Sequence, residues 1–149
     1  MVDILHKIGI KASSSAVHAA LGTTSGLSGW WTKDTSGDAE AEGILAFRFN
    51  GSGPDFRVER NEAGKVEWRC LAGPNEWIGT RITFAFAENP QRPEETLLYF
   101  THGGWKEPCE FMHHCSTKWA TFMLSLKAKL ETGQGRPFPD DIKITGGTS

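Results

Sequence analysis

His102 is the residue whose type and position best suit acid–base chemistry. It shares strand parity with Leu98 and Phe100, so its imidazole should point to the same face as these apolar side chains. There it could hydrogen-bond a ligand carbonyl or carboxylate, or act as a general base near neutral pH. Glu110 could orient the imidazole, although the helix dipole explains a carboxylate in the first turn of a helix equally well. The alternative for His102 is a structural histidine at a strand end, bonded to a neighbouring backbone group.

Four residues near this histidine have the side-chain types of zinc ligands. Cys109 and His113 are four residues apart and would share a helix face, whereas Cys115 points elsewhere. Only two ligands align, so we expect no metal and no cofactor, and favour a small buried Cys115 beside exposed His113 and His114. The sequence contains no Gly-x-Ser-x-Gly elbow and no phosphate-binding loop of the Gly-Lys-Ser/Thr type. A serine hydrolase or a nucleotide-dependent enzyme is therefore disfavoured.

The composition restricts the classes of partner. The 149 residues include nine Phe and six Trp but a single Tyr, so a large apolar area must be buried in a heavy core or around an apolar cavity. The formal net charge of −2 gives no support to binding of nucleic acid or of an anionic membrane surface. We find no signal peptide and no apolar run long enough to span a membrane. Three cysteines, an odd number, predict reduced thiols in a cytoplasmic protein.

The hydrophobic pattern predicts one domain of mixed strands and helices. Alternation of apolar and polar residues indicates strands, and helical spacing indicates two short helices and one long helix. Short turns containing glycine or proline join the later strands, which favours antiparallel neighbours. Residues 34–42 are expected to form a loop, and Gly103 with Gly104 a turn. The expected strands are 3–12, 43–49, 55–62, 65–72, 79–87 and 95–102, and the expected helices are 14–21, 25–31 and 109–131.

The long helix over residues 109–131 carries an apolar stripe. Apolar residues recur at intervals of three and four along one of its faces, which must be buried against the sheet. Lys118, Lys127 and Lys129 are expected on the opposite, wetter side. A strongly twisted sheet that holds such a helix in its concave face leaves space between the two. Side chains that fill this space make a core, and side chains that fall short of it leave an apolar pocket.

The order and spacing of four segments carry a resemblance to a known family. The segments are SSAVHAAL at 14–21 with TTSGLSGWW at 23–31, GILAFRF at 43–49, LYFTHGGW at 98–105, and WATFMLSLKAKLETG at 119–133. They resemble the START-like helix-grip superfamily, also called SRPBCC or polyketide cyclase-like, and within it homologues of the activator of the heat-shock-protein-90 ATPase. The resemblance implies an α+β fold in which a six-stranded curved antiparallel sheet wraps around a long C-terminal helix, with two short helices between the first two strands.

The resemblance covers residues 4–135, almost the whole chain. We therefore expect a single START-like domain over residues 1–135. An extended C-terminal tail is expected over residues 136–149, with a mobile end.

These observations together predict a non-enzymatic domain that encloses a small apolar, aromatic or lipid-like molecule between the sheet and the long helix. Two alternatives stay open: a cyclase- or hydrolase-like enzyme that uses His102 as acid and base with help from Glu110, and a co-chaperone-like interaction module with an exposed patch. No nucleic acid and no membrane insertion are expected, and a homodimer is left open. The candidate ligand-binding residues are Trp30, Trp31, Phe47, Phe49, Trp68, Phe84, Phe86, Phe100, His102, Met112, Cys115, Trp119, Phe122 and Met123.

Overall fold

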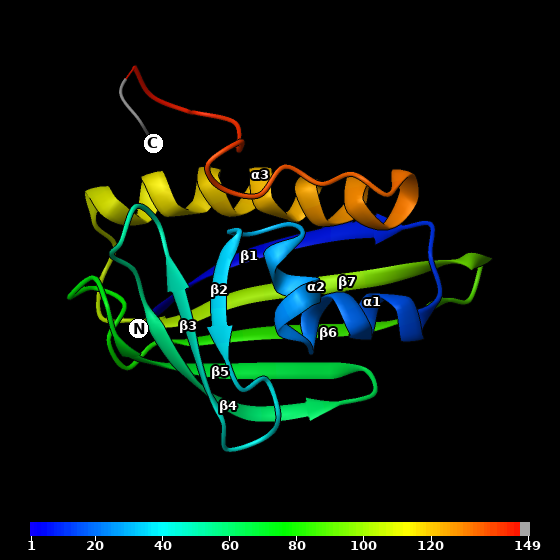
Figure 1. The fold of residues 1–149 in the computed structure, drawn as a ribbon, viewed down its shortest axis with the longest axis horizontal. Coiled ribbons are helices and arrows are strands. Elements are labelled where there is room, and N and C mark those ends of the chain that lie inside the picture. Colours follow the sequence, from blue (N-terminus) through cyan, green and yellow to red (C-terminus); the bar gives the residue numbers. More distant parts are fainter. Residues whose placement is uncertain (147–149) are drawn as a thin grey trace.

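The computed structural model describes residues 1–146, in which a curved antiparallel sheet packs against a long C-terminal helix (Figure 1). The strands are β1 (Val2–Ile10), β2 (Asp34–Gly37), β3 (Ile44–Arg48), β4 (Asp55–Glu62), β5 (Lys65–Ala72), β6 (Arg81–Asn89) and β7 (Arg92–Trp105). The helices are α1 (Ser14–Leu21), α2 (Thr24–Ser28) and α3 (Glu110–Thr132). Within the described residues, all strands belong to one sheet in the order β1-β7-β6-β5-β4-β3-β2. The predicted α+β class, with a curved antiparallel sheet and a long C-terminal helix, is confirmed.

The sheet of the described residues has seven strands rather than the predicted six, because part of the expected loop over residues 34–42 is a strand. β2 pairs antiparallel with β3, from Asp34 opposite Arg48 to Gly37 opposite Leu45. Its side chains are mostly exposed because β2 is an edge of the sheet, so it lacks the apolar alternation that marks a strand in a sequence. Gly37 ends β2 with a φ of 104°, and a Cβ there would clash with the backbone of β3.

The last strand continues through the two glycines for which a turn was predicted. β7 shifts register against β1 at Asp3, where two residues of β7 oppose one residue of β1. Gly104 has a φ of 86° at this bulge, and its N–H donates to Asp3 Oδ1 at 3.0 Å. The turn predicted at Gly103 and Gly104 is therefore wrong. The bulge carries the strand on to Trp105, which is buried in the core.

The helix predictions are correct to within a few residues at each end. The Ser13 hydroxyl caps α1 by accepting a hydrogen bond from the Ala16 N–H at 3.1 Å. α2 is shorter than predicted, so Trp30 and Trp31 follow this helix instead of belonging to it. α3 ends at Thr132 and is followed by Gly133, whose φ of 88° is the left-handed conformation typical of a glycine at a helix C-terminus. No helix in residues 1–146 combines the length and apolarity needed to cross a membrane.

The core lies between the concave face of the sheet and α3. Alternate residues of β5, β6 and β7 point to this face, where the buried stripe of α3 covers them. The rings are in direct contact: the centroid of Trp119 lies 4.6 Å from Phe100 and 4.9 Å from Trp31. Most of the Phe and Trp residues are therefore used in a packed core.

Candidate functional site

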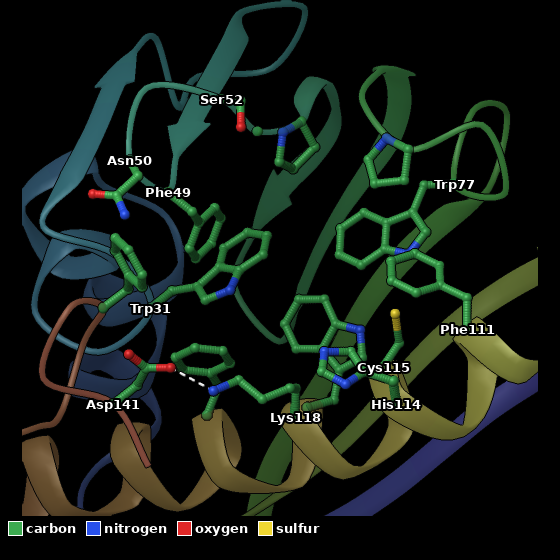
Figure 2. Close-up of a pocket in the computed structure, with 16 residues that line it drawn as sticks. Trp31, Phe49, Asn50, Ser52, Trp77, Phe111, His114, Cys115, Lys118 and Asp141 are labelled. Carbon is green, nitrogen blue, oxygen red and sulfur yellow. Dashed lines mark hydrogen bonds and ion pairs between the residues drawn. The ribbon is translucent and has the colours of Figure 1, made fainter. Parts of the chain in front are cut away.

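A cavity of about 390 Å³ lies in the space between the sheet and α3 (Figure 2). Its walls come from the β3–β4 loop, the β5–β6 loop, α3, and the segment that follows α3. The exposed Asn50 and Ser52 lie at its rim, and the buried Trp31 and Trp119 lie at its base. Its volume is in the range of small-molecule sites. The lining residues are Trp31, Phe49, Asn50, Ser52, Gly53, Pro54, Pro74, Trp77, Phe111, His114, Cys115, Lys118, Trp119, Phe122, Phe138 and Asp141.

Aromatic rings form much of the wall. Trp31 is 2% exposed and its ring centroid lies 4.9 Å from that of Trp119. Trp77 stacks on Trp119 at 6.0 Å with an interplanar angle of 18°, and Phe49 meets Phe138 edge to face at 5.2 Å. Each of these rings is braced by another ring, which opposes their collapse into the space. The cavity thus offers ring faces and edges to an aromatic guest.

The structure brings only part of the predicted ligand-binding set to the cavity. Strand parity predicts the face that a side chain takes, but not whether a ring from α3 already occupies the space in front of it. The predicted residues on the cavity wall are Trp31, Phe49, Cys115, Trp119 and Phe122. The others belong to the core: Trp30, Phe47, Trp68, Phe84, Phe86, Phe100, His102 and Met123 are buried, and the half-buried Met112 packs against them.

His102 is fully buried, and both of its ring nitrogens are hydrogen-bonded. Trp119 Nε1–H donates to His102 Nδ1 at 3.1 Å, and because an indole nitrogen can only donate, Nδ1 is unprotonated. The proton of the neutral ring is therefore on Nε2, which donates to Thr80 Oγ1 at 2.8 Å. Thr80 in turn donates to the Trp77 carbonyl oxygen at 2.5 Å. The four residues form one directed chain, which leaves neither ring nitrogen available to a ligand.

The surroundings of His102 also disfavour the proton transfer considered for it. Burial lowers the pKa of His102 to about 3, because the charged imidazolium is poorly solvated there. Its predicted helper Glu110 is exposed in the first turn of α3 and borders a separate surface hollow together with Cys109 and His113. The structure therefore does not bring His102 and Glu110 together in the cavity.

Among the residues considered as zinc ligands, Cys109, His113 and His114 border the same surface hollow at the start of α3, whereas Cys115 lines the cavity. His114 is half-buried rather than exposed, and its ring stacks on Phe111 at 6.0 Å. Burial raises the pKa of Cys115 to about 12, so the thiol stays protonated and is a poor nucleophile. Across residues 1–146, no three or more His, Cys, Asp or Glu side chains are placed to hold a metal ion.

Two oppositely charged side chains, Lys118 and Asp141, meet on the cavity wall (Figure 2). Lys118 Nζ donates to Asp141 Oδ2 and, at 2.8 Å, to the Ile142 carbonyl oxygen. Lys143 Nζ holds the other carboxylate oxygen, Oδ1, at 2.5 Å. The Asp141 side chain is only 4% exposed, so ammonium groups take the place of water around it.

The ion pair contradicts the prediction that Lys118 lies on the wetter side of the long helix. Its side chain is 14% exposed, and its ammonium lies 5.1 Å from the centroid of the Phe122 ring. Burial by itself would raise the pKa of Asp141, but hydrogen bonds and attraction from Lys118 and Lys143 outweigh burial and hold the pKa below its ordinary value. The ionised carboxylate therefore fastens the segment after α3 to that helix.

The segment after α3 returns to the sheet and closes one side of the cavity. The Phe138 N–H donates to the Trp31 carbonyl oxygen at 2.8 Å, and the Lys33 N–H donates to the Phe138 carbonyl oxygen at 3.1 Å. Residues of the tail expected over 136–149 thus supply part of the wall. The predicted mobile end of this tail includes residues 147–149, which lie outside the described residues.

Sequence reasoning missed the wall residues that come from loops and from the tail. Trp77 follows a predicted turn, and a large apolar residue in a polar loop is a signal that the loop folds back onto the core. Phe138 gives the same signal within a segment rich in glycine and proline. The missed residues are Asn50, Ser52, Gly53, Pro54, Pro74, Trp77, Phe111, His114, Lys118, Phe138 and Asp141.

Comparison with known proteins gives matches among solved structures alone: no protein-family model and no curated protein sequence matches the chain. The chain is similar to Aha1 from Colwellia psychrerythraea, whose solution structure is that of a dimer, with 46% identity and a TM-score of 0.81 over 91% of this chain and 100% of that one. SSP2350 from Staphylococcus saprophyticus is 19% identical, with a TM-score of 0.73 over 91% of this chain and 97% of its own. CalU16 from Micromonospora echinospora is 16% identical, with a TM-score of 0.78 over 99% of this chain and 76% of its own. The last two similarities show the shared fold.

Proposed function

This chain belongs to the Aha1-like family of START-like (SRPBCC) proteins, and on that premise we propose that it binds a small apolar or aromatic molecule without catalysing a reaction. The observation that carries the proposal is the cavity of about 390 Å³ between the sheet and α3. The rings of its wall pack against one another, and Trp31 also packs against the buried Phe47, so the free space is part of the fold. A guest that fills it gains burial of apolar surface and stacking on the walls.

The two side chains best suited to catalysis support binding over catalysis. His102 has both ring nitrogens engaged and lies in the core. Cys115 faces the cavity but holds its proton at neutral pH. The cyclase- or hydrolase-like alternative would need another acid or base.

Two further proposals concern the assembly and the location of the protein. Its 46% identical relative is a dimer, which supports a homodimer here as well. The three cysteines are free thiols, which supports a cytoplasmic location. The co-chaperone alternative rests on the family resemblance, whereas ligand binding rests on a feature of the structure.

Indole resonances of the six Trp residues test the proposal residue by residue. 1-Naphthylmethanol, a neutral aromatic probe, is titrated into labelled protein and the ¹⁵N–¹H indole signals are recorded. We expect saturable shifts for Trp31, Trp77 and Trp119, because these rings line the cavity. Trp30, whose Nε1 bonds the Ala20 carbonyl oxygen at 2.9 Å, should shift little.

The control for this titration lies in the same spectrum. Trp105 is buried in the core and does not line the cavity. Equal shifts at Trp105 and Trp77 would indicate a general change in the fold, and no saturable shift at any indole would rule out binding of this class of molecule.

A further inference from the structure

Lys118 presents a hydrogen-bond donor on the wall of the cavity. Lys118 Nζ carries three N–H donors, and two of them are used by Asp141 and by the Ile142 carbonyl oxygen. Within residues 1–146 no acceptor is recorded for the third, and the side chain lines the cavity. A hydrogen-bond acceptor on a bound molecule would engage the third N–H of Lys118.

Trp77 lies on the other side of the cavity. Trp77 is 8% exposed, and its buried Nε1–H has no oxygen or nitrogen acceptor in the part of the chain that the structure describes. The group it does approach is the thiol of Cys115, a weak acceptor. Figure 2 shows Trp77 on the opposite side of the cavity from Asp141. Because this nitrogen is buried and directed at the thiol, Trp77 presents its ring, not its N–H, to a guest.

The charges around the wall favour an anion over a cation. Asp141 is the carboxylate of the wall, and both of its oxygens already accept hydrogen bonds, Oδ2 from Lys118 and Oδ1 from Lys143. Because both Asp141 oxygens are taken by ammonium groups, the charged group left to bind a guest is Lys118. The buried position of Lys118 strengthens its attraction for an anion relative to a lysine in water.

We propose that the natural ligand is an aromatic acid whose anionic head group binds Lys118 while its rings lie among the aromatic side chains of the cavity. This inference rests on the proposed function and adds the class of ligand to it. The carboxylate accepts the third N–H of Lys118, and the rings of the ligand stack on the aromatic side chains of the wall. The ion pair with Asp141 holds the ammonium in place before the ligand arrives.

The test compares two probes that share one aromatic body, 1-naphthoate and 1-naphthylmethanol. Dissociation constants are measured at neutral pH from tryptophan fluorescence. Wild-type protein is expected to bind the carboxylate roughly tenfold more tightly than the alcohol, as a charged hydrogen bond allows. Lys118→Met should remove this preference, so that the variant binds the carboxylate and the alcohol with similar affinity.

Lys129→Met is the matched control, because Lys129 is an exposed lysine of the same helix that does not line the cavity. It should keep the wild-type preference. Because Lys118→Met leaves Asp141 one partner short, the double variant Lys118→Met/Asp141→Asn removes both charges together and should also lose the preference. Equal affinities of wild-type protein for the two probes, or a preference that persists without Lys118, would overturn the inference. Failure of both probes to bind wild-type protein would instead overturn the proposed function.

Discussion

Trp31→Ala is expected to lower the free energy of unfolding by about 3–5 kcal/mol, the usual cost of truncating a buried tryptophan. The Trp31 ring is 2% exposed and lies 4.3 Å from Phe47, 4.9 Å from Trp119 and 5.7 Å from Phe49, measured between centroids. Its removal leaves a void that joins the existing cavity, and the neighbouring rings cannot close it without losing contacts of their own. Urea unfolding followed by circular dichroism measures the effect.

Tyr99→Ala is the control for this variant. Tyr99 is 48% exposed on the outer parity of β7, so its loss should cost about 1 kcal/mol or less. A loss below about 1 kcal/mol for Trp31→Ala would mean that the aromatic cluster repacks freely. The cavity wall would then not be the rigid surface described above.

Lowering the pH is expected to lower the free energy of unfolding through His102. The pKa of His102 is about 3 in the folded protein and should be near 6.5 in the unfolded chain. Between these values the unfolded state binds a proton that the folded state excludes, so stability is full above pH 6.5 and falls as the pH decreases. The slope approaches about 1.4 kcal/mol per pH unit as the unfolded histidine becomes protonated, which amounts to about 2 kcal/mol between pH 6.5 and pH 4.5.

Comparison of the wild type with His102→Gln separates the effect of His102 on stability in acid from the effect of carboxylate protonation. A glutamine amide can accept from Trp119 and donate to Thr80, so the variant keeps polar partners but has no group that titrates in this range. The difference in unfolding free energy between wild type and variant should shrink steadily below pH 6.5. The wild-type imidazole resonances provide an independent measurement: His102 should remain neutral, with its proton on Nε2, down to pH 4.5. Titration of His102 near pH 6.5 would contradict its description as a structural histidine.

Local patterns in the sequence were sufficient to predict most of the fold. The apolar stripe of α3 and the alternation in β5 to β7 depend on neighbours within a few residues, and they predicted elements that the structure confirms. β2 was missed because its pairing with β3 is a tertiary contact between polar residues. The bulge at Gly104 was missed for a related reason: it depends on an Asp3 carboxylate that lies at the other end of the chain.

The candidate site was less predictable than the fold, because a cavity forms only where the surrounding side chains leave space unfilled. Parity placed Phe84 and Phe100 on the correct face, but these rings meet each other at 5.4 Å and leave no room for a guest. The actual walls combine α3 with loops and with the C-terminal segment, whose residues carry no periodic pattern. The pairing of Lys118 with Asp141 spans 23 residues, which helical spacing could not reveal.

The most direct measurement of the central claim is the dissociation constant of 1-naphthylmethanol for a protein whose cavity has been filled. Cys115→Phe places a ring into the free space from α3, whereas Leu124→Phe adds the same ring at a position of α3 that is 55% exposed and does not line the cavity. We expect Leu124→Phe to bind like wild type and Cys115→Phe, confirmed as folded by circular dichroism, to bind at least about tenfold more weakly. Undiminished binding by a folded Cys115→Phe protein would show that the cavity is not the binding site.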